Sequence, residues 1–222
     1  MGWIVWLGLI LLSEGVHTSP HMPPVEKNTV PTASVLVFKR SPFHIDGRST
    51  EPAWQQVPTI GPLQMVEPYE GGSPTEPTEV HVAATPTALY IGIRCYDDEP
   101  SQIVSYTMQR DGDLRNEDHI RLVLDTFLDG RTGYVFAVNA NGARYDALVI
   151  REGEGENPNW DGIWEAAATR DAEGWSVEIR IPIKTLRFRS DLHTWGFNLE
   201  RRIQRRQEID RWASPSRNFS VT

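Results

Sequence analysis

One short stretch of the chain concentrates side chains that could hold a metal ion. Residues 111–118, Asp-Gly-Asp-Leu-Arg-Asn-Glu-Asp, carry five carboxylate or amide groups within eight positions. Hard cations such as calcium prefer clustered carboxylate and carbonyl oxygens, so Asp111, Asp113 and Asp118 are the candidate ligands. The run is not an EF-hand loop, because Arg115 stands where that loop places a ligand. A solvated acidic loop is the alternative interpretation.

Tryptophan side chains offer a second kind of chemistry. Six of the eight tryptophans lie after the first 18 residues, and an aromatic face is what the C–H groups of a sugar ring pack against. Trp175 and Trp195 alternate with aliphatic residues, which predicts that they belong to a core. Trp164 begins an alternating segment and is expected to anchor it. Trp160 lies in a polar loop and is therefore the better candidate for an exposed platform.

Trp212 is a further candidate for a sugar platform. The positions two residues away are Asp210 and Ser214, whereas a core residue of a strand should alternate with apolar neighbours. The pattern therefore predicts an exposed Trp212. On this interpretation, Trp212→Ala should abolish glycan binding while changing the stability little.

The sequence lacks the motifs of common catalytic sites and the charge of a nucleic-acid-binding protein. It contains no His-Glu-x-x-His, Gly-x-Ser-x-Gly or glycine-rich phosphate loop. Its formal net charge of -8 argues against a nucleic-acid partner. The arginines between 201 and 206 are interspersed with polar and acidic residues and predict a solvated strand face. We expect a non-catalytic module, with any glycoside hydrolysis carried out by a linked or co-secreted enzyme.

The first residues are typical of an exported protein. The apolar run 2–12 is too short to span a bilayer but suits a secretory signal, so residues 1–18 are predicted to be a signal peptide. Residues 19–34, rich in Pro, Thr and Ser, are predicted to be a flexible tether. A lone cysteine, Cys95, permits no internal disulfide. Together these features indicate the periplasm or the outer-membrane surface of a bacterium.

The rest of the chain reads as a succession of short β-strands. Residues 89–95, 120–124 and 175–181 alternate between apolar and other side chains, and no stretch has a helical apolar stripe. Asn141-Gly142 separates two such runs and is a strong hairpin signal, because both residues tolerate positive φ.

These strands predict an all-β protein with an antiparallel β-sandwich of jelly-roll or immunoglobulin-like architecture. About eight to eleven strands are expected. We assign the sandwich to residues 35–215 and a truncated tail to residues 216–222.

Several pieces of the sequence, in their order and spacing, resemble a family 9 carbohydrate-binding module of the DOMON-like superfamily. These pieces are Ile45-Asp46-Gly47 with Trp54, then segments 89–97, 117–125, 133–136, 174–179 and 195–198. The resemblance extends over roughly residues 40–215. Such modules occur in xylanases and in front of outer-membrane β-barrels. The resemblance implies a β-sandwich that binds a polysaccharide or oligosaccharide such as xylan, and that holds structural calcium.

The sugar site of that family carries over only in part. Its modules hold a terminal sugar between two tryptophans; one position is retained as Trp212, and the other falls on Arg115. The family's strand glutamate falls on Arg121, and an asparagine of the next strand matches Asn139, while the neighbouring arginine falls on Ala137. Arginine can stack on a sugar or bind a carboxylate bidentately. Uronate-bearing ligands are therefore expected to outcompete neutral ones.

Two further classes of function remain open. The Arg115 and Arg121 replacements favour a periplasmic interaction domain that precedes an outer-membrane β-barrel and has lost sugar binding. The third possibility is a haem-binding sandwich of the related DOMON type, which an absorption spectrum without a Soret band would exclude. Its candidate axial ligands are Met65, Met108, His81 and His119.

Overall fold

The computed structural model describes residues 30–150 and 155–213. The predicted signal peptide 1–18, most of the tether 19–34 and the tail 216–222 lie outside the described residues. In the part that is described, no helix has the length and apolarity that crossing a membrane requires.

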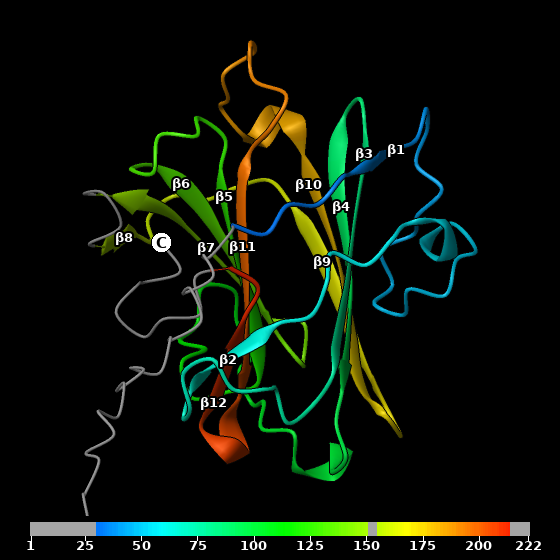
Figure 1. The fold of residues 1–222 in the computed structure, drawn as a ribbon, viewed down its shortest axis with the longest axis vertical. Helices are drawn as coiled ribbons and strands as arrows, with labels where there is room; N and C mark the ends of the chain where they lie inside the picture. The colour runs from blue at the N-terminus through cyan, green and yellow to red at the C-terminus, as the bar shows by residue number, and fades with distance from the viewer. Residues whose placement is uncertain (1–29, 151–154, 214–222) are drawn as a thin grey trace, which may run out of the picture.

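Two β-sheets pack face to face (Figure 1). The five-stranded sheet has the order β1-β3-β4-β10-β9, and the seven-stranded sheet has the order β2-β12-β11-β5-β6-β7-β8. Neighbouring strands are antiparallel except for the parallel pair β1–β3. The strands are β1 (Leu36–Val37), β2 (Gln64–Glu67), β3 (Thr78–Thr85), β4 (Ala88–Tyr96), β5 (His119–Asp125), β6 (Gly133–Asn139), β7 (Arg144–Ile150), β8 (Gly155–Asn157), β9 (Glu165–Asp171), β10 (Gly174–Pro182), β11 (Gly196–Ile203) and β12 (Glu208–Arg211).

The predicted all-β sandwich is confirmed. The described residues hold twelve strands, more than the about eight to eleven expected, because the two-residue β1 and three-residue β8 are too short to show alternation. The described residues also hold four single turns of 3-10 helix. They are η1 (Trp54–Gln56), η2 (Pro100–Gln102), η4 (Ile183–Thr185) and η5 (Gln204–Arg206).

The main core lies between the sheets and is built by the predicted alternation. In β4, Ile91, Ile93 and Cys95 are fully buried there, and burial raises the pKa of the Cys95 thiol to about 11. Trp175 of β10 is also fully buried, as predicted. Trp195 is half-buried and packs at the edge of this core.

The segment Ile45-Asp46-Gly47 and Trp54 pack against the outer side of the five-stranded sheet and have a structural role. The Glu178 carboxylate of β10 accepts the Trp54 indole N–H at 2.8 Å and the backbone N–H groups of Asp46 and Gly47 at 3.0 and 2.9 Å. Gly47 has φ +84°, and a Cβ there would lie 2.8 Å from the backbone of β9. A side chain is therefore excluded at that position.

The predicted hairpin at Asn141-Gly142 joins β6 and β7. Gly142 has φ +82°, and the side-chain oxygen of Asn139 accepts the backbone N–H groups of Asn141 and Ala143 at 3.1 and 2.8 Å. The turn is therefore closed by both its glycine and the side chain that precedes it.

The prediction that the arginines between 201 and 206 form a solvated strand face is wrong for Arg201. Its side chain is fully buried between the sheets and donates to the Thr78 hydroxyl at 2.9 Å and to the carbonyls of Pro77 and Tyr96 at 2.9 and 2.6 Å. These acceptors belong to the facing sheet, so the guanidinium ties the two layers together. Buried polar groups are retained where such partners satisfy them.

Candidate functional site

The loop of residues 104–118 connects the five-stranded sheet to β5 and is held by a buried carboxylate. Glu117 has no exposed surface and accepts the backbone N–H groups of Tyr106 and Thr107 at 2.9 and 3.2 Å and the Asn139 amide at 2.8 Å. Burial alone would raise the pKa of Glu117, but these hydrogen bonds together lower it below its usual value. An ionised Glu117 thus fixes the loop backbone.

Asn139, the residue matched to the family's sugar-binding asparagine, is fully buried. Besides the bond to Glu117, its amide nitrogen donates to the Thr107 carbonyl at 2.8 Å, and its oxygen closes the β6–β7 turn. All of its hydrogen-bonding groups are therefore engaged within the protein. The structure places Asn139 beneath the 104–118 loop, where it positions that loop.

Two further contacts fasten the 104–118 loop. The buried Asp118 accepts the backbone N–H of Val104 at 2.9 Å. Arg110 reaches the fully buried Asp146 of β7 at 2.6 Å. A loop held by buried charge-assisted bonds on both flanks presents its side chains in a fixed geometry.

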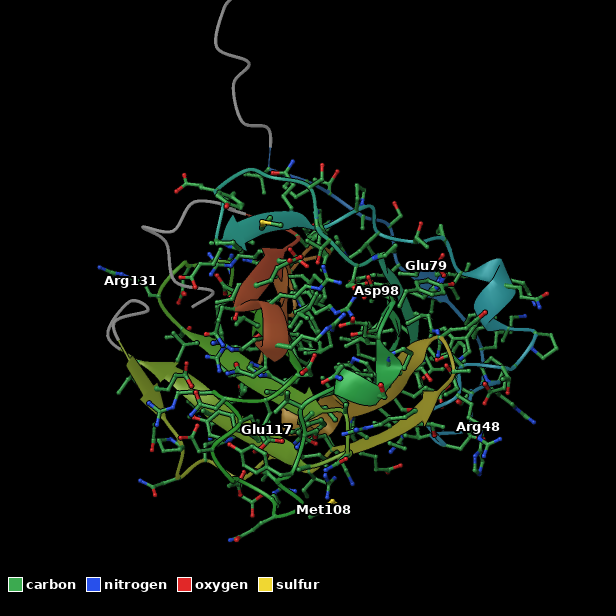
Figure 2. The ribbon with its side chains drawn as sticks, turned by 90° about the horizontal axis from the view of Figure 1, so that it is seen from below. Arg48, Glu79, Asp98, Met108, Glu117 and Arg131 are labelled. Carbon is green, nitrogen blue, oxygen red and sulfur yellow. The ribbon has the colours of Figure 1, made fainter. Side chains whose placement is uncertain are left out.

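The fixed loop exposes an aromatic ring. Tyr106 is 64% exposed and Met108 is 74% exposed. Thr107, which lies between them, and Ser105, which precedes Tyr106, are half-buried. Figure 2 shows Met108 at the rim of the molecule, pointing away from it, while Glu117 lies inside. Sequence reasoning missed Tyr106 because it considered tryptophans only. The exposed aromatic side chains of the described residues are Tyr69, Tyr106 and Phe188.

Arg115, the predicted replacement for the first family tryptophan, lies exposed on the same loop. Its guanidinium binds Asp113 in a two-point ion pair, with Nε and Nη2 at 2.9 and 2.7 Å from the two carboxylate oxygens. The hydrogen bond from Arg115 lowers the pKa of Asp113 to about 2. The positive charge of Arg115 already has an acidic partner.

Arg121 lies on the outer face of the seven-stranded sheet, the face turned away from the other sheet. It forms an ion pair with Glu156 of β8, and Glu156 also accepts the Tyr145 hydroxyl at 3.0 Å. Across the sheet, Arg121 stands opposite Glu200 of β11, which pairs with Arg211 of β12 at 2.8 Å. The outer face therefore carries alternating charges that neutralise one another.

Trp212 corrects the prediction of an exposed platform. Its indole N–H donates to the Ile60 carbonyl at 2.9 Å, and its ring contacts Phe197 edge-on, with centroids 5.7 Å apart. The side chain is half-buried against the main core. The alternation failed as a guide because Asp210, two residues earlier, is itself fully buried.

Trp160 is half-buried, and its ring packs on Tyr134 and Phe136 with centroid distances of 5.1 and 5.9 Å. It lies at the edge of the main core rather than standing free as a platform. Trp164 is buried, and its indole N–H donates to Asp146 at 2.9 Å. The prediction that Trp164 anchors its segment is confirmed.

The candidate haem ligands do not face one cavity. His81 of β3 and His119 of β5 alternate with core residues of their strands, so they lie on the outer faces of opposite sheets. Met108 is exposed on the 104–118 loop, and Met65 of β2 is buried. This arrangement does not offer a pair of axial ligands to one haem.

The predicted calcium ligands are not gathered in the structure. Among the described residues, the one group of three acidic side chains close enough to share an ion is Glu76, Asp97 and Asp98. Asp111, Asp113 and Asp118 do not form such a group. Arg205 and Arg206 of η5 form ion pairs with this acidic cluster, with nitrogen–oxygen distances of 2.6–2.9 Å.

The guanidinium groups already supply the positive charge that a cation would bring to this cluster. Hydrogen bonds from Glu76 and Arg206 lower the pKa of Asp98 to about 2, while burial raises that of Glu76. The residues therefore do not fit a calcium ion.

We expect thermal unfolding to show the same midpoint in calcium chloride and in EDTA. The reason is that Asp113 and the Glu76 cluster are already paired with arginines, and that Asp118 accepts the Val104 backbone N–H. A ligand that binds only the folded state raises the midpoint. An increase of a few degrees in calcium would reveal an ion site and contradict this account.

Similarity to known proteins is found in the structure and not in the sequence. No protein-family model matches the chain, and no curated protein matches it significantly. A crystal structure from Bacteroides uniformis, named as a candidate carbohydrate-binding protein, superposes with a TM-score of 0.65 at 13% identity, covering 83% of this chain and 90% of that one.

Two structures of a family 9 carbohydrate-binding module from Caldicellulosiruptor kristjanssonii are also similar. The complex with cellotriose gives a TM-score of 0.54 at 16% identity, covering 82% of this chain and 90% of that one. The complex with glucose gives 0.53 at 16% identity, covering 82% and 92%. The chain has the fold of a family 9 carbohydrate-binding module. The resemblance inferred from the sequence is thereby confirmed at the level of the fold.

Proposed function

We propose that this family 9-like module binds a polysaccharide or oligosaccharide and has no catalytic role of its own. The observation that carries the proposal is an exposed aromatic side chain, Tyr106, on a loop whose backbone is fixed by the buried Glu117. Sugar rings bind to exposed aromatic faces flanked by a few oriented polar groups. The fold supports the same conclusion, because similar structures contain cellotriose and glucose.

The setting of this binding follows from the sequence. The apolar leader suits export, so the module would act outside the cytoplasm, in the periplasm or at the outer-membrane surface of a bacterium. Binding there would hold a glycan such as xylan close to enzymes of carbohydrate catabolism. Xylan is one polysaccharide that this proposal allows, and an associated glycosidase would perform the hydrolysis.

One observation favours a second function, an interaction domain in front of an outer-membrane β-barrel. Of the two aromatic positions that enclose the sugar in the family, Trp212 is half-buried against the core here and Arg115 is paired with Asp113. Both features support the loss of the inherited sugar slot. Such an interaction domain would retain the fold but would no longer bind sugar.

A glycan array probed with the full chain separates these two functions. The carbohydrate-binding proposal predicts dose-dependent binding to a chemically related set of glycans. An array that shows no binding to any glycan, with the protein folded by circular dichroism, would contradict the proposal and leave the interaction domain.

A further inference from the structure

Arg170 of β9 is an exposed arginine without an acidic partner among the described residues. Its guanidinium is held instead by the Asn141 side-chain oxygen at 2.8 Å and by the carbonyls of Ala140, Ile103 and Ser105 at 3.3–3.5 Å. Neutral acceptors orient the guanidinium without cancelling its charge. A position fixed in this way is suited to receive an anion.

The other arginines considered for sugar binding differ in this respect. Arg115 already binds Asp113 at two points, and Arg121 is paired with Glu156. A ligand carboxylate at either position would have to displace an internal one. Arg170 is therefore a better candidate than Arg115 or Arg121 for binding the carboxylate of an acidic sugar.

Arg170 contacts the backbone of the fixed loop at Ser105, the residue before the exposed Tyr106. The Ser105 carbonyl that accepts from Arg170 belongs to the peptide bond between Ser105 and Tyr106, and the N–H of that same peptide bond is held by Glu117. One fixed peptide group thus holds the backbone of Tyr106 and also accepts a hydrogen bond from the Arg170 guanidinium. The Asn141 amide also donates to the Ser105 carbonyl, at 2.9 Å.

We propose that the surface formed by Tyr106, Met108 and Arg170 binds a uronic acid residue of a saccharide. The sugar ring stacks on Tyr106 with Met108 beside it, and the sugar carboxylate pairs with the Arg170 guanidinium. This inference rests on the proposed carbohydrate-binding function and names the ligand class and the residues. It uses an arginine at the edge of the loop that no acidic side chain of the described residues pairs with.

Calorimetric titration of the full chain with trigalacturonate, its methyl ester and cellotriose tests the ligand class. The ester keeps the rings and removes the charge. A charge-assisted bond is stronger than a neutral one, so trigalacturonate should bind about tenfold more tightly than its ester. The difference should shrink in high salt, because the site is exposed. Equal affinity for acid and ester would overturn the inference.

Variants test the residues. Tyr106→Ala and Arg170→Gln should each weaken trigalacturonate binding about tenfold or more, and Arg170→Gln should also remove the preference over the ester. Arg170→Lys keeps the charge and should restore part of that preference even if the glutamine variant loosens the loop. Tyr69→Ala, which removes another highly exposed tyrosine, located between β2 and β3, should bind as the parent does.

The remaining outcomes are also decisive. Loss of binding in Phe188→Ala instead would place the ligand in the hollow of about 570 Å³ beside η4 that Phe188 lines, and would overturn the inference. Binding of cellotriose that none of the Tyr106 and Arg170 variants changes would overturn it as well, while leaving carbohydrate binding intact. Absence of binding to all three saccharides would count against both proposals.

Discussion

Trp212→Ala is expected to destabilise the protein by about 3 kcal/mol, the lower end of the cost for removing a core tryptophan. The ring is half-buried against the core and its indole N–H satisfies the Ile60 carbonyl. Both contacts would be lost together. For a domain of this size the melting midpoint should fall by roughly 6–12 °C.

Thermal and urea unfolding of the parent and the variant measure this effect. Trp212→Phe is the matched control. It removes the hydrogen bond but only part of the packing, so its midpoint should lie between those of the parent and the alanine variant. An alanine variant with the parent's midpoint that no longer binds saccharide would show Trp212 to be a free platform after all.

Asp210→Asn is expected to stabilise the protein at neutral pH. Asp210 of β12 is fully buried, and neither of its oxygens accepts a hydrogen bond from the described residues. Burial first, and then the neighbouring Glu208 carboxylate, raise the pKa of Asp210 to about 8. Asparagine has a similar shape and no charge to bury.

The direction of the pH dependence follows from that raised pKa. Between the usual aspartate value, about 4, and about 8, the folded state keeps a proton that the unfolded state has lost. The contribution of Asp210 to the free energy of unfolding is thus fully present below about pH 4. It is lost as the pH rises toward about 8, by about 1.4 kcal/mol per pH unit. At pH 7 the variant should be more stable by a few kcal/mol, on the order expected for one such group.

Chemical unfolding of the parent and Asp210→Asn at pH 5, 7 and 9 tests this. Glu117, whose pKa is lowered, is ionised in both the folded and the unfolded state across this range and does not obscure the comparison. The stability gain of the variant should grow from pH 5 to pH 7 and level off above about 8. A gain that is constant across this range would mean that Asp210 does not titrate in the folded protein.

Much of the fold was predictable because the apolar core follows the period of a strand. Ile91 and Ile93 of β4 lie inward as the alternation requires, and Gly142 takes the positive φ that its turn signal implies. These features depend on local sequence alone. The short β1 and β8 escaped prediction because two or three residues are too few to show alternation, and the partner of β1, strand β3, is also distant in the sequence.

The candidate site was predicted less well because buried polar groups break the simple pattern. Glu208 and Asp210 alternate with outward residues yet are buried, so the position of Trp212 two residues further on was misassigned. The acidic run 111–118 looked like an ion site, but part of it serves to hold a loop. Only long-range contacts show which charges are already compensated, as with Arg121 and Glu156.

Chemical-shift mapping on the isotope-labelled full chain tests the central claim most directly. Titration with trigalacturonate and with cellotriose should shift the amide signals of the 104–118 loop and of the β6–β7 turn in a saturable way, with trigalacturonate the stronger ligand. The signals around Trp212 should stay in place. Shifts confined to the surroundings of Trp212, or no saturable shift with either saccharide, would contradict the account.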